Sequence, residues 1–268
     1  MNKFENNCVN LLSDLIENHG VVGIKTSFED EGATFNEALR LKEICNQAKT
    51  KLTLKIGGPE ALRDIQDSQI IGVKGLVAPM IESGFALNKF VDCVNKQLSP
   101  EVVSLLQLSI NIESMSGWAA LNNIFGSKNI DKLSSVTFGR VDFVSSIEKT
   151  RDYVDSEYVY SKVLDIFQAA KNKGLKTNLG GAISVKSLEF LTKLNSAGLL
   201  DKFETRYVIY DTSALKNLNK ALQKGQEFEL NWLLNKKEMH GRLSEKDDMR
   251  IKMINERINE SRIPTPSK

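Results

Sequence analysis

Short apolar runs alternate with amphipathic segments along most of this chain, and this alternation limits its possible folds more than any other feature. The runs are apolar through successive positions, which is typical of strands buried on both faces. They begin roughly 23–40 residues apart, a spacing that leaves room for a helix between strands and is too long for hairpins. We predict strands at residues 21–25, 52–56, 75–79, 105–110, 136–138, 176–179 and 207–210.

Repeated strand–helix units in a chain of this length predict either a (β/α)8 TIM barrel or an open doubly wound sheet. We prefer the barrel, although seven strands are one too few to close it. The missing strand is expected near the N-terminus or within residues 141–160. Helices are predicted to begin after Thr34, which forms a capping box with Glu37, and at Pro59, which follows Gly58.

The composition narrows the possible partners. The 268 residues contain 36 Lys and Arg against 34 Asp and Glu, so the net charge of +2 predicts no nucleic-acid or membrane partner. Cys8, Cys45 and Cys93 are widely spaced and form no CxxC pair, which argues against disulfides and structural zinc. No signal-peptide or membrane-spanning run is evident, so we expect a cytoplasmic protein acting on a small molecule.

The composition changes after residue 225, where the chain becomes mostly charged with sparse apolar positions. We therefore divide the chain into a barrel domain, residues 1–225, and a helical extension with a tail, residues 226–268. The extension is predicted to be a charged helix across the outside of the barrel. The alternative is an arm that packs on a neighbouring subunit of a homo-oligomer. The terminal PTPSK is expected to be a frayed tail.

The residues that follow the predicted strands are polar and rich in glycine. In parallel α/β folds these positions meet at one end of the sheet, where active sites are built. Carboxylates follow most of the strands, as in FEDEG at residues 28–32. Hard divalent cations take oxygen ligands and need few from the protein, so these ends are suited to a Mg²⁺ or Mn²⁺ site.

Four of these segments resemble a known family when taken in order. They are KIGGPEA, GLVAPMIES, INIES and FGRVDF, which begin at Lys55, Gly75, Ile110 and Phe138. The chain is similar to the HpcH/HpaI aldolase and citrate lyase β-subunit superfamily over roughly residues 20–215. That resemblance implies a phosphoenolpyruvate/pyruvate-binding TIM barrel. It also implies that Glu113 of INIES and Asp142 of FGRVDF hold a divalent metal, which chelates a 2-oxo acid.

The sequence departs from the family pattern in two places. Lys55 stands where the family usually has an arginine that supports the enolate oxygen and substrate, and lysine cannot reproduce its bidentate contact. Arg140 is the candidate replacement, although it could equally point outward. The aldolase branch also uses a histidine as base, and neither His19 nor His240 falls in a family motif. We therefore name Lys55 and Arg140 as candidate catalytic residues.

For other candidate residues, a structural role such as a salt bridge competes with the functional role. Gly57 and Gly58 could present backbone N–H groups to a substrate carboxylate or phosphate. Glu29 and Glu31 are candidate bases, and Glu29 is also a candidate substrate contact, but a salt bridge in the loop explains these two residues nearly as well. Lys55 could pair with Glu29 or Glu82 instead of substrate. Lys25 is either a charge inside the barrel, which we prefer, or a surface residue.

These features favour a metal-dependent carbon–carbon lyase of aldolase type, which acts on a 2-oxo acid through a pyruvate-like enolate. One alternative is citrate-lyase-like cleavage of a citryl or malyl thioester, with an acyl thioester as substrate. The other is a barrel without catalysis that serves as a binding subunit. The resemblance also suggests a symmetric homo-oligomer.

Overall fold

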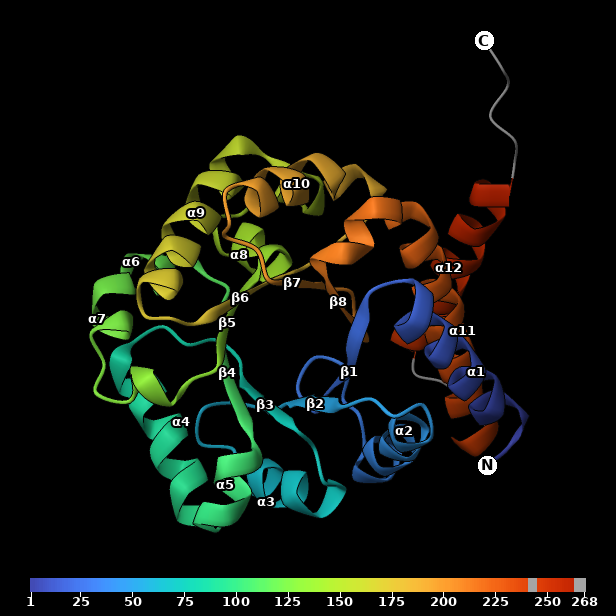
Figure 1. Cartoon of the computed structure of the whole chain (residues 1–268), viewed down its shortest axis with the longest axis horizontal. Coiled ribbons are helices and arrows are strands. Elements are labelled where there is room, and N and C mark those ends of the chain that lie inside the picture. Colours follow the sequence, from blue (N-terminus) through green and yellow to red (C-terminus); the bar gives the residue numbers. More distant parts are fainter. Residues whose placement is uncertain (241–244, 263–268) are drawn as a thin grey trace.

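A computed structural model describes residues 1–240 and 245–262; the predicted tail lies outside them. Its described strands close into a single barrel in the order of the sequence (Figure 1). The strands are β1 (Val21–Ser27), β2 (Leu52–Lys55), β3 (Gly75–Ala78), β4 (Gln107–Ile112), β5 (Ser135–Gly139), β6 (Lys176–Gly180), β7 (Lys202–Glu204) and β8 (Val208–Asp211). The predicted eight-stranded α/β barrel is therefore confirmed.

The last strand runs against its neighbours. Strands β1 to β7 are parallel along the barrel, whereas β8 pairs antiparallel with both β7 and β1. Only residues 205–207 connect β7 to β8, too few for a helical crossover, so the chain turns back as a hairpin.

The eighth strand was placed wrongly by the sequence prediction. Residues 3–18 and 140–146, which lie in the two regions where the missing strand was expected, are helical. The eighth strand is instead β7, just before the predicted strand at 207–210. β7 has three residues, of which only Phe203 is apolar, so it carries too little pattern to be recognised. The predicted strand at 105–110 is also displaced, since residues 100–105 form a short helix and β4 begins at Gln107.

Helices form the outer layer of the barrel, as Figure 1 shows. The α-helices are α1 (Lys3–Asn18), α2 (Phe35–Gln47), α3 (Leu62–Ile71), α4 (Gly84–Gln97), α5 (Pro100–Leu105), α6 (Met115–Ala119), α7 (Leu121–Phe125), α8 (Arg140–Ser146), α9 (Glu157–Asn172), α10 (Leu188–Ser196), α11 (Leu218–His240) and α12 (Glu245–Arg262). The 3-10 helices are η1 (Ile130–Lys132), η2 (Arg151–Asp155), η3 (Val185–Ser187) and η4 (Thr212–Asn217). None of the helices in the described ranges combines the length and apolar character that crossing a bilayer requires.

The two C-terminal helices lie beside α1 in Figure 1. α11 contacts α1 along its length, and the Asn2 amide donates to Asn235 Oδ1 at 2.6 Å. α12 packs on α11 through a small apolar cluster of Leu233, Ile254 and Ile258. The boundary predicted after residue 225 falls inside α11 and stays a prediction. α12 differs from the expected helix on the outside of the barrel, because several of its side chains line a cavity described below.

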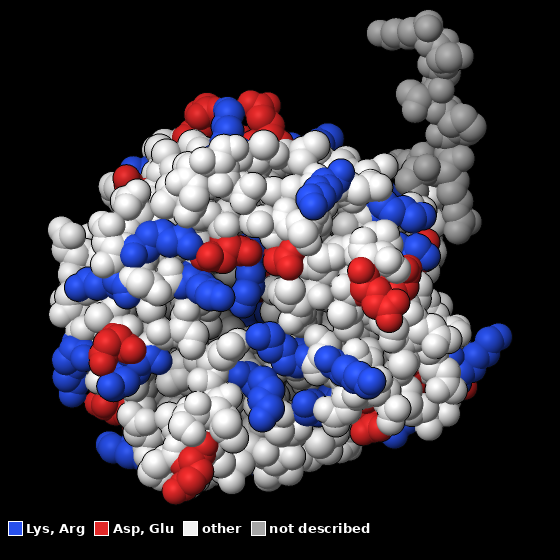
Figure 2. All heavy atoms as spheres, viewed as in Figure 1, with Lys and Arg blue, Asp and Glu red and all other residues white. Residues whose placement is uncertain are grey.

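Lysines mark the N-terminal ends of several strands. Lys51 precedes β2, while Lys176 and Lys202 begin β6 and β7. Burial lowers the pKa of Lys202, and the ammonium groups of Lys51 and Lys176 lower it further. Figure 2 shows Lys and Arg side chains gathered near the middle of the face that Figure 1 views, with Asp and Glu side chains beside them. Charges of both signs also surround a cavity at the C-terminal ends of the strands.

Gly225 allows α11 to pack closely on the barrel. Tyr210 of β8 is fully buried, stacks on Phe203 with ring centroids 5.1 Å apart, and donates its hydroxyl to the Ala221 carbonyl at 3.2 Å. A Cβ atom at position 225 would overlap that hydroxyl. The absence of a side chain at Gly225 therefore sets how near this helix approaches β8.

We predict that Gly225→Ala destabilises the protein by about 1–2 kcal/mol, because overpacking outweighs the helix propensity that alanine gains. Urea denaturation would measure the change. The matched control is the same substitution in a Tyr210→Phe background, where the hydroxyl is gone and the cost is expected to fall. Equal costs in both backgrounds would contradict the proposed contact.

Candidate active site

A cavity of about 460 Å³ lies at the C-terminal ends of the parallel strands. Its volume falls within the range of about 300–1,000 Å³ that is usual for small-molecule sites. Strand-end residues form much of its wall, because parallel strands all end at the same side of a barrel. These residues are Lys25, Ser27, Lys55, Asn111, Glu113, Thr137, Gly139, Gly180 and Glu204. The loops after β1 and β6, the β7–β8 connection, helices α8, α11 and α12, and η2 complete the lining.

Glu113, which follows β4, is almost fully buried at 2% exposure. The Met80 backbone N–H donates to its Oε1 at 3.0 Å, and the Asn111 side-chain amide donates to its Oε2 at 3.0 Å. Gly139 of β5 makes this position possible, since a Cβ atom there would lie 2.5 Å from Glu113 Oε2. The glycine of FGRVDF therefore provides the space that the glutamate of INIES occupies.

Asp142 lies in the first turn of α8 and lines the same cavity, so the structure brings the two predicted metal ligands to one site. Burial raises the pKa of Glu113, Lys55 opposes this, and Asp142 raises it further. Burial likewise raises the pKa of Asp142, with Lys55 opposing and Asp30 contributing to the rise. A further cation at this end would favour the ionised form of both carboxyl groups.

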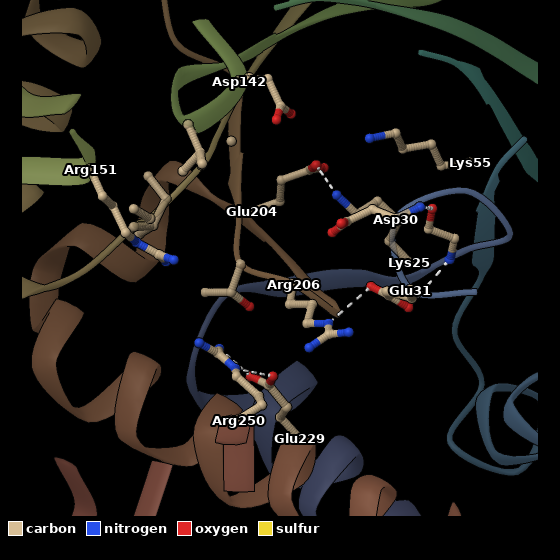
Figure 3. Close-up of a pocket in the computed structure, with 18 of the residues that line it drawn as sticks. Lys25, Asp30, Glu31, Lys55, Asp142, Arg151, Glu204, Arg206, Glu229 and Arg250 are labelled. Atoms are coloured by element: carbon tan, nitrogen blue, oxygen red, sulfur yellow. Dashed lines mark hydrogen bonds and ion pairs between the residues drawn. The ribbon is translucent and has the colours of Figure 1, made fainter. Parts of the chain in front are cut away.

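Lys55 ends β2 and points into this group of carboxylates (Figure 3). Its Nζ lies 3.0 Å from Glu29 Oε2 and 4.0 Å from Glu113 Oε1. Burial alone would lower the pKa of Lys55, but Glu113, Glu29 and Asp142 together raise it above its ordinary value. Of the two salt bridges considered for Lys55, the one to Glu29 is formed, so Glu29 acts here as the partner of the lysine.

The oxygen atoms at this end of the cavity fit a hard divalent cation. Glu113 and Asp142 supply carboxylates, and the buried Asn111 Oδ1 has no hydrogen-bond partner among the described residues. The described ranges hold no group of three or more Asp, Glu, His or Cys side chains placed around one metal position. Two carboxylates are nonetheless sufficient for Mg²⁺, which usually keeps its remaining positions for water or substrate oxygens.

Arg140 is placed differently from the sequence prediction. Its side chain is fully buried and does not line the cavity. The guanidinium donates to the Gly181 carbonyl at 2.7 Å, pairs with Asp155, and stacks over the Phe190 ring at 5.1 Å. These contacts join α8 to η2 and to the segments after β6. Arg140 therefore cannot supply the bidentate substrate contact considered for it in this arrangement.

Gly57 and Gly58 also lie outside the cavity lining. The Gly57 N–H donates to Asp64 Oδ2 at 2.7 Å, so it is already satisfied within the protein. The helix expected to begin at Pro59 begins instead at Leu62, which removes a helix N-terminus from the two glycines. The geometry gives their proposed substrate contact no support.

Besides Lys25, which the sequence analysis considered, the cavity is lined by residues that were not singled out from the sequence, among them Glu204, Arg206 and Arg250. Lys25 of β1 forms an ion pair with Glu204 of β7, which confirms that Lys25 faces the interior of the barrel. The Asn178 amide also donates to Glu204 Oε2 at 2.5 Å. Arg206 follows Glu204 in the unrecognised hairpin, and Arg250 comes from α12. The sequence signal for Glu204 and Arg206 was a lone Phe203 between charges, which is too weak to mark a strand end.

Glu31 lies in the loop after β1, where its side chain is 3% exposed. The Ser27 N–H donates to its Oε2 at 3.3 Å, and Arg206 Nε lies 3.6 Å from its Oε1. Burial raises the pKa of Glu31 to about 7, even though Arg206 and Lys25 act to lower it. Glu31 therefore forms an ion pair, as Glu29 does, but in both cases the partner lies outside this loop.

Comparisons with known proteins agree with the resemblance seen in the sequence. Residues 35–184 match the family model described as HpcH/HpaI aldolase/citrate lyase. Among solved structures, the HpcH/HpaI aldolase from Desulfitobacterium hafniense DCB-2 is 15% identical, with a TM-score of 0.58 over 79% of this chain and 85% of that chain. The citrate synthase SbnG is 14% identical, with a TM-score of 0.61 over 82% of this chain and 89% of that chain.

A third solved structure, an HpcH/HpaI aldolase/citrate lyase family protein from Burkholderia cenocepacia J2315, gives a similar result. It is 12% identical, with a TM-score of 0.59 over 83% of this chain and 90% of that chain. At such identities these structures establish the fold alone. The comparison with curated proteins finds no match.

We predict that Glu31 makes the stability of the protein depend on pH. Its folded pKa of about 7 lies above the ordinary value of 4.5, so the folded state holds a proton that the unfolded state loses between these values. The stability contributed by this group is therefore present below pH 4.5 and is lost as the pH rises through 7. In Glu31→Gln this loss is absent, so the variant should gain on the order of 3 kcal/mol relative to wild type over that range.

Denaturant unfolding of the two proteins at several pH values from 4 to 8 would measure this difference. The test is how the difference in free energy of unfolding between the two proteins varies with pH. The altered hydrogen bonding of the amide adds the same amount to that difference at every pH, so it does not affect the result. Parallel stability curves for the wild type and Glu31→Gln would show that the carboxyl titrates normally.

Proposed function

The chain belongs to the HpcH/HpaI aldolase/citrate lyase family, and from this membership we propose that it is a divalent-metal-dependent carbon–carbon lyase. Family membership supports a lyase-type function. We propose further that the substrate is a 2-oxo acid, whose cleavage passes through a pyruvate-like enolate. The observation that carries the proposal is the pairing of Glu113 with Asp142 at one end of a cavity, beside Lys55 and the unsatisfied Asn111 Oδ1.

The reaction needs a site that stabilises negative charge as it develops. In the cleavage direction the hydroxyl at C4 of the 2-oxo acid loses its proton, the C3–C4 bond breaks, and an aldehyde leaves. The electron pair of that bond passes into the enolate of pyruvate, which is then protonated at C3. Groups fixed in position before the reaction stabilise such charge without having to reorganise.

Glu113 and Asp142 would hold Mg²⁺ or Mn²⁺, which would supply Lewis-acid stabilisation of the enolate oxygen. The protein prepares these ligands in a definite way. Asn111 and the Met80 N–H orient Glu113, while burial raises the pKa of both carboxyl groups. Added positive charge would stabilise the ionised form of both carboxyl groups. The affinity of the pair for a cation rises with pH as the carboxyl groups ionise.

Lys55 adds a fixed positive charge at the same end. Its ammonium lies between Glu29 and Glu113, and the carboxylates around it keep it protonated. A protonated lysine here attracts the carboxylate of an incoming 2-oxo acid and disfavours a second cation at the same position. Lys55 would therefore contribute the charge of the usual family arginine without its fork of donors.

The proposed partner of the protein is a small-molecule 2-oxo acid, or an acyl thioester in the alternative reaction. Cytoplasmic location and assembly into a homo-oligomer stay predictions, as does the expectation of no nucleic-acid or membrane partner.

We predict that the protein exchanges the methyl protons of pyruvate for deuterium in the presence of Mg²⁺ or Mn²⁺. Proton NMR in D2O would follow the loss of the methyl signal. The measurement asks only whether the enolate forms, so the aldehyde need not be known. Glu113→Gln and Asp142→Asn are each expected to slow exchange by about a hundredfold or more, because several kcal/mol of charge stabilisation are lost.

Glu82→Gln is the matched control. Glu82 also follows a strand and accepts a hydrogen bond from Ser114, but it does not line the cavity, so exchange should continue in this variant. No exchange with any divalent metal would overturn the proposal of a pyruvate enolate. Exchange that survives in Glu113→Gln and Asp142→Asn would overturn the assignment of the two ligands.

A further inference from the structure

The cavity has a second charged end, away from Glu113 and Asp142. Figure 3 shows Asp142 and Lys55 toward one side of the view, whereas Arg250 and Glu229 lie toward the other. Arg206 and Arg151 also line the cavity, and both are drawn nearer to Arg250 than to Asp142. Arg206 comes from the β7–β8 hairpin, Arg151 from η2 and Arg250 from α12. Three separate parts of the chain thus bring guanidinium groups to one place.

Arg206 keeps unused hydrogen-bond donors in a buried position. Its side chain is 14% exposed, and its Nε and one terminal nitrogen have no hydrogen-bond partner among the described residues. The nearest carboxylates stand too far away to accept a hydrogen bond: Glu31 lies at 3.6 Å and Asp247 at 3.8 Å. Buried donors are rarely left unsatisfied, so these two N–H groups indicate room for an acceptor that the protein itself does not supply.

Arg151 also lacks a partner among the described side chains that lie around it. Burial lowers the pKa of Arg151, and the positive charge of Arg250 lowers it further. Arg250 is itself held in place by Glu229, through hydrogen bonds of 2.6 and 2.7 Å. The repulsion between Arg151 and Arg250 is therefore built into the cavity wall, and a bound anion would relieve it.

The size of the cavity leaves space for such a ligand. A volume of about 460 Å³ is several times what a pyruvate occupies, so the carbon chain of a longer substrate can extend from Lys55 towards the arginines. Guanidinium groups bind the oxygens of carboxylates and phosphates through charge-assisted hydrogen bonds, often two at a time. Arg206 and Arg250 lie beyond residues 35–184, the segment that the family model matches.

We propose that Arg151, Arg206 and Arg250 form a second anion subsite, which holds a carboxylate or phosphate at the far end of the substrate. The fragment released with pyruvate is then an aldehyde that carries an anionic group. This inference rests on the proposed function, because it takes the opposite end of the same cavity to bind the 2-oxo acid group.

The test in the synthetic direction compares aldehydes that differ in charge. Pyruvate is offered with butanal or 4-oxobutanoate, and with glyceraldehyde or glyceraldehyde 3-phosphate. We expect the wild type to favour the anionic member of at least one pair in kcat/KM, and the pair with the larger preference identifies carboxylate or phosphate. In Arg151→Gln that preference should fall by about tenfold or more, as expected for a lost charge-assisted hydrogen bond.

Arg151 is the residue to change, since Arg206 and Arg250 also pair with carboxylates and their replacement could disturb the fold. Arg63→Gln is the matched control, because Arg63 is exposed on α3 and lies outside the cavity; it should keep the full preference. A ratio of two substrates within one variant is insensitive to a loss of folded protein. Equal rates for both members of each pair, or a preference unchanged in Arg151→Gln, would overturn the subsite.

A binding measurement separates this inference from the proposed reaction. Calorimetry without metal or pyruvate would titrate the protein with propyl phosphate and with butyrate, using propan-1-ol as the uncharged probe. Binding of an anionic probe that weakens in Arg151→Gln and not in Arg63→Gln supports the subsite even if pyruvate exchange is absent. Pyruvate exchange together with no binding of either anionic probe overturns the subsite and leaves the proposed reaction standing.

Discussion

Closure of the barrel requires the last strand to pair with both β7 and β1, since an open edge would leave backbone N–H and C=O groups without partners. β8 meets this requirement while running backwards, so the chain leaves it at the end where the parallel strands begin. The 23 residues of α11 then span roughly 35 Å, enough to return along the barrel to the cavity end. In a barrel with a parallel last strand, the final helix would run the opposite way. The reversed strand thus explains how α12 reaches the cavity.

The candidate site depends on how the protein offsets the free-energy cost of burying the carboxylate of Glu113. An isolated carboxylate would be strongly disfavoured at the position of Glu113. Three features make it tolerable: the missing side chain of Gly139, the N–H donors of Met80 and Asn111, and the ammonium of Lys55. Burial still raises the pKa of Glu113, which means that the protein alone does not fully compensate the charge. A site left in this condition is suited to a cation that arrives from solution.

Charge is also arranged along the length of the cavity. Carboxylates with two lysines surround the end near Glu113. Three guanidinium groups gather where the hairpin and α12 meet, and two of them lie beside the carboxylates of Glu31 and Glu229. Such separation is suited to an extended anionic substrate, since each end attracts a different part of it. Glu113 and Asp142 of the first end lie within the segment that the family model matches. The second end is built largely from residues outside the matched segment, Arg206 and Arg250 among them.

Local sequence pattern was sufficient to predict most of the fold and the position of Glu113 and Asp142 in the candidate site. Apolar runs spaced for strand–helix units predicted the barrel, and strand-end motifs placed Glu113 and Asp142 at one rim, because parallel strands end together. The pattern was insufficient for β7, whose three residues carry one apolar side chain, and so Glu204 and Arg206 were missed.

The tertiary structure alone decided the direction of β8, the approach of α12 to the cavity, and the burial of Arg140 against Gly181 and Asp155. Periodicity in a sequence records which face of an element is buried. It does not record which distant element covers that face, and long-range packing settles that choice.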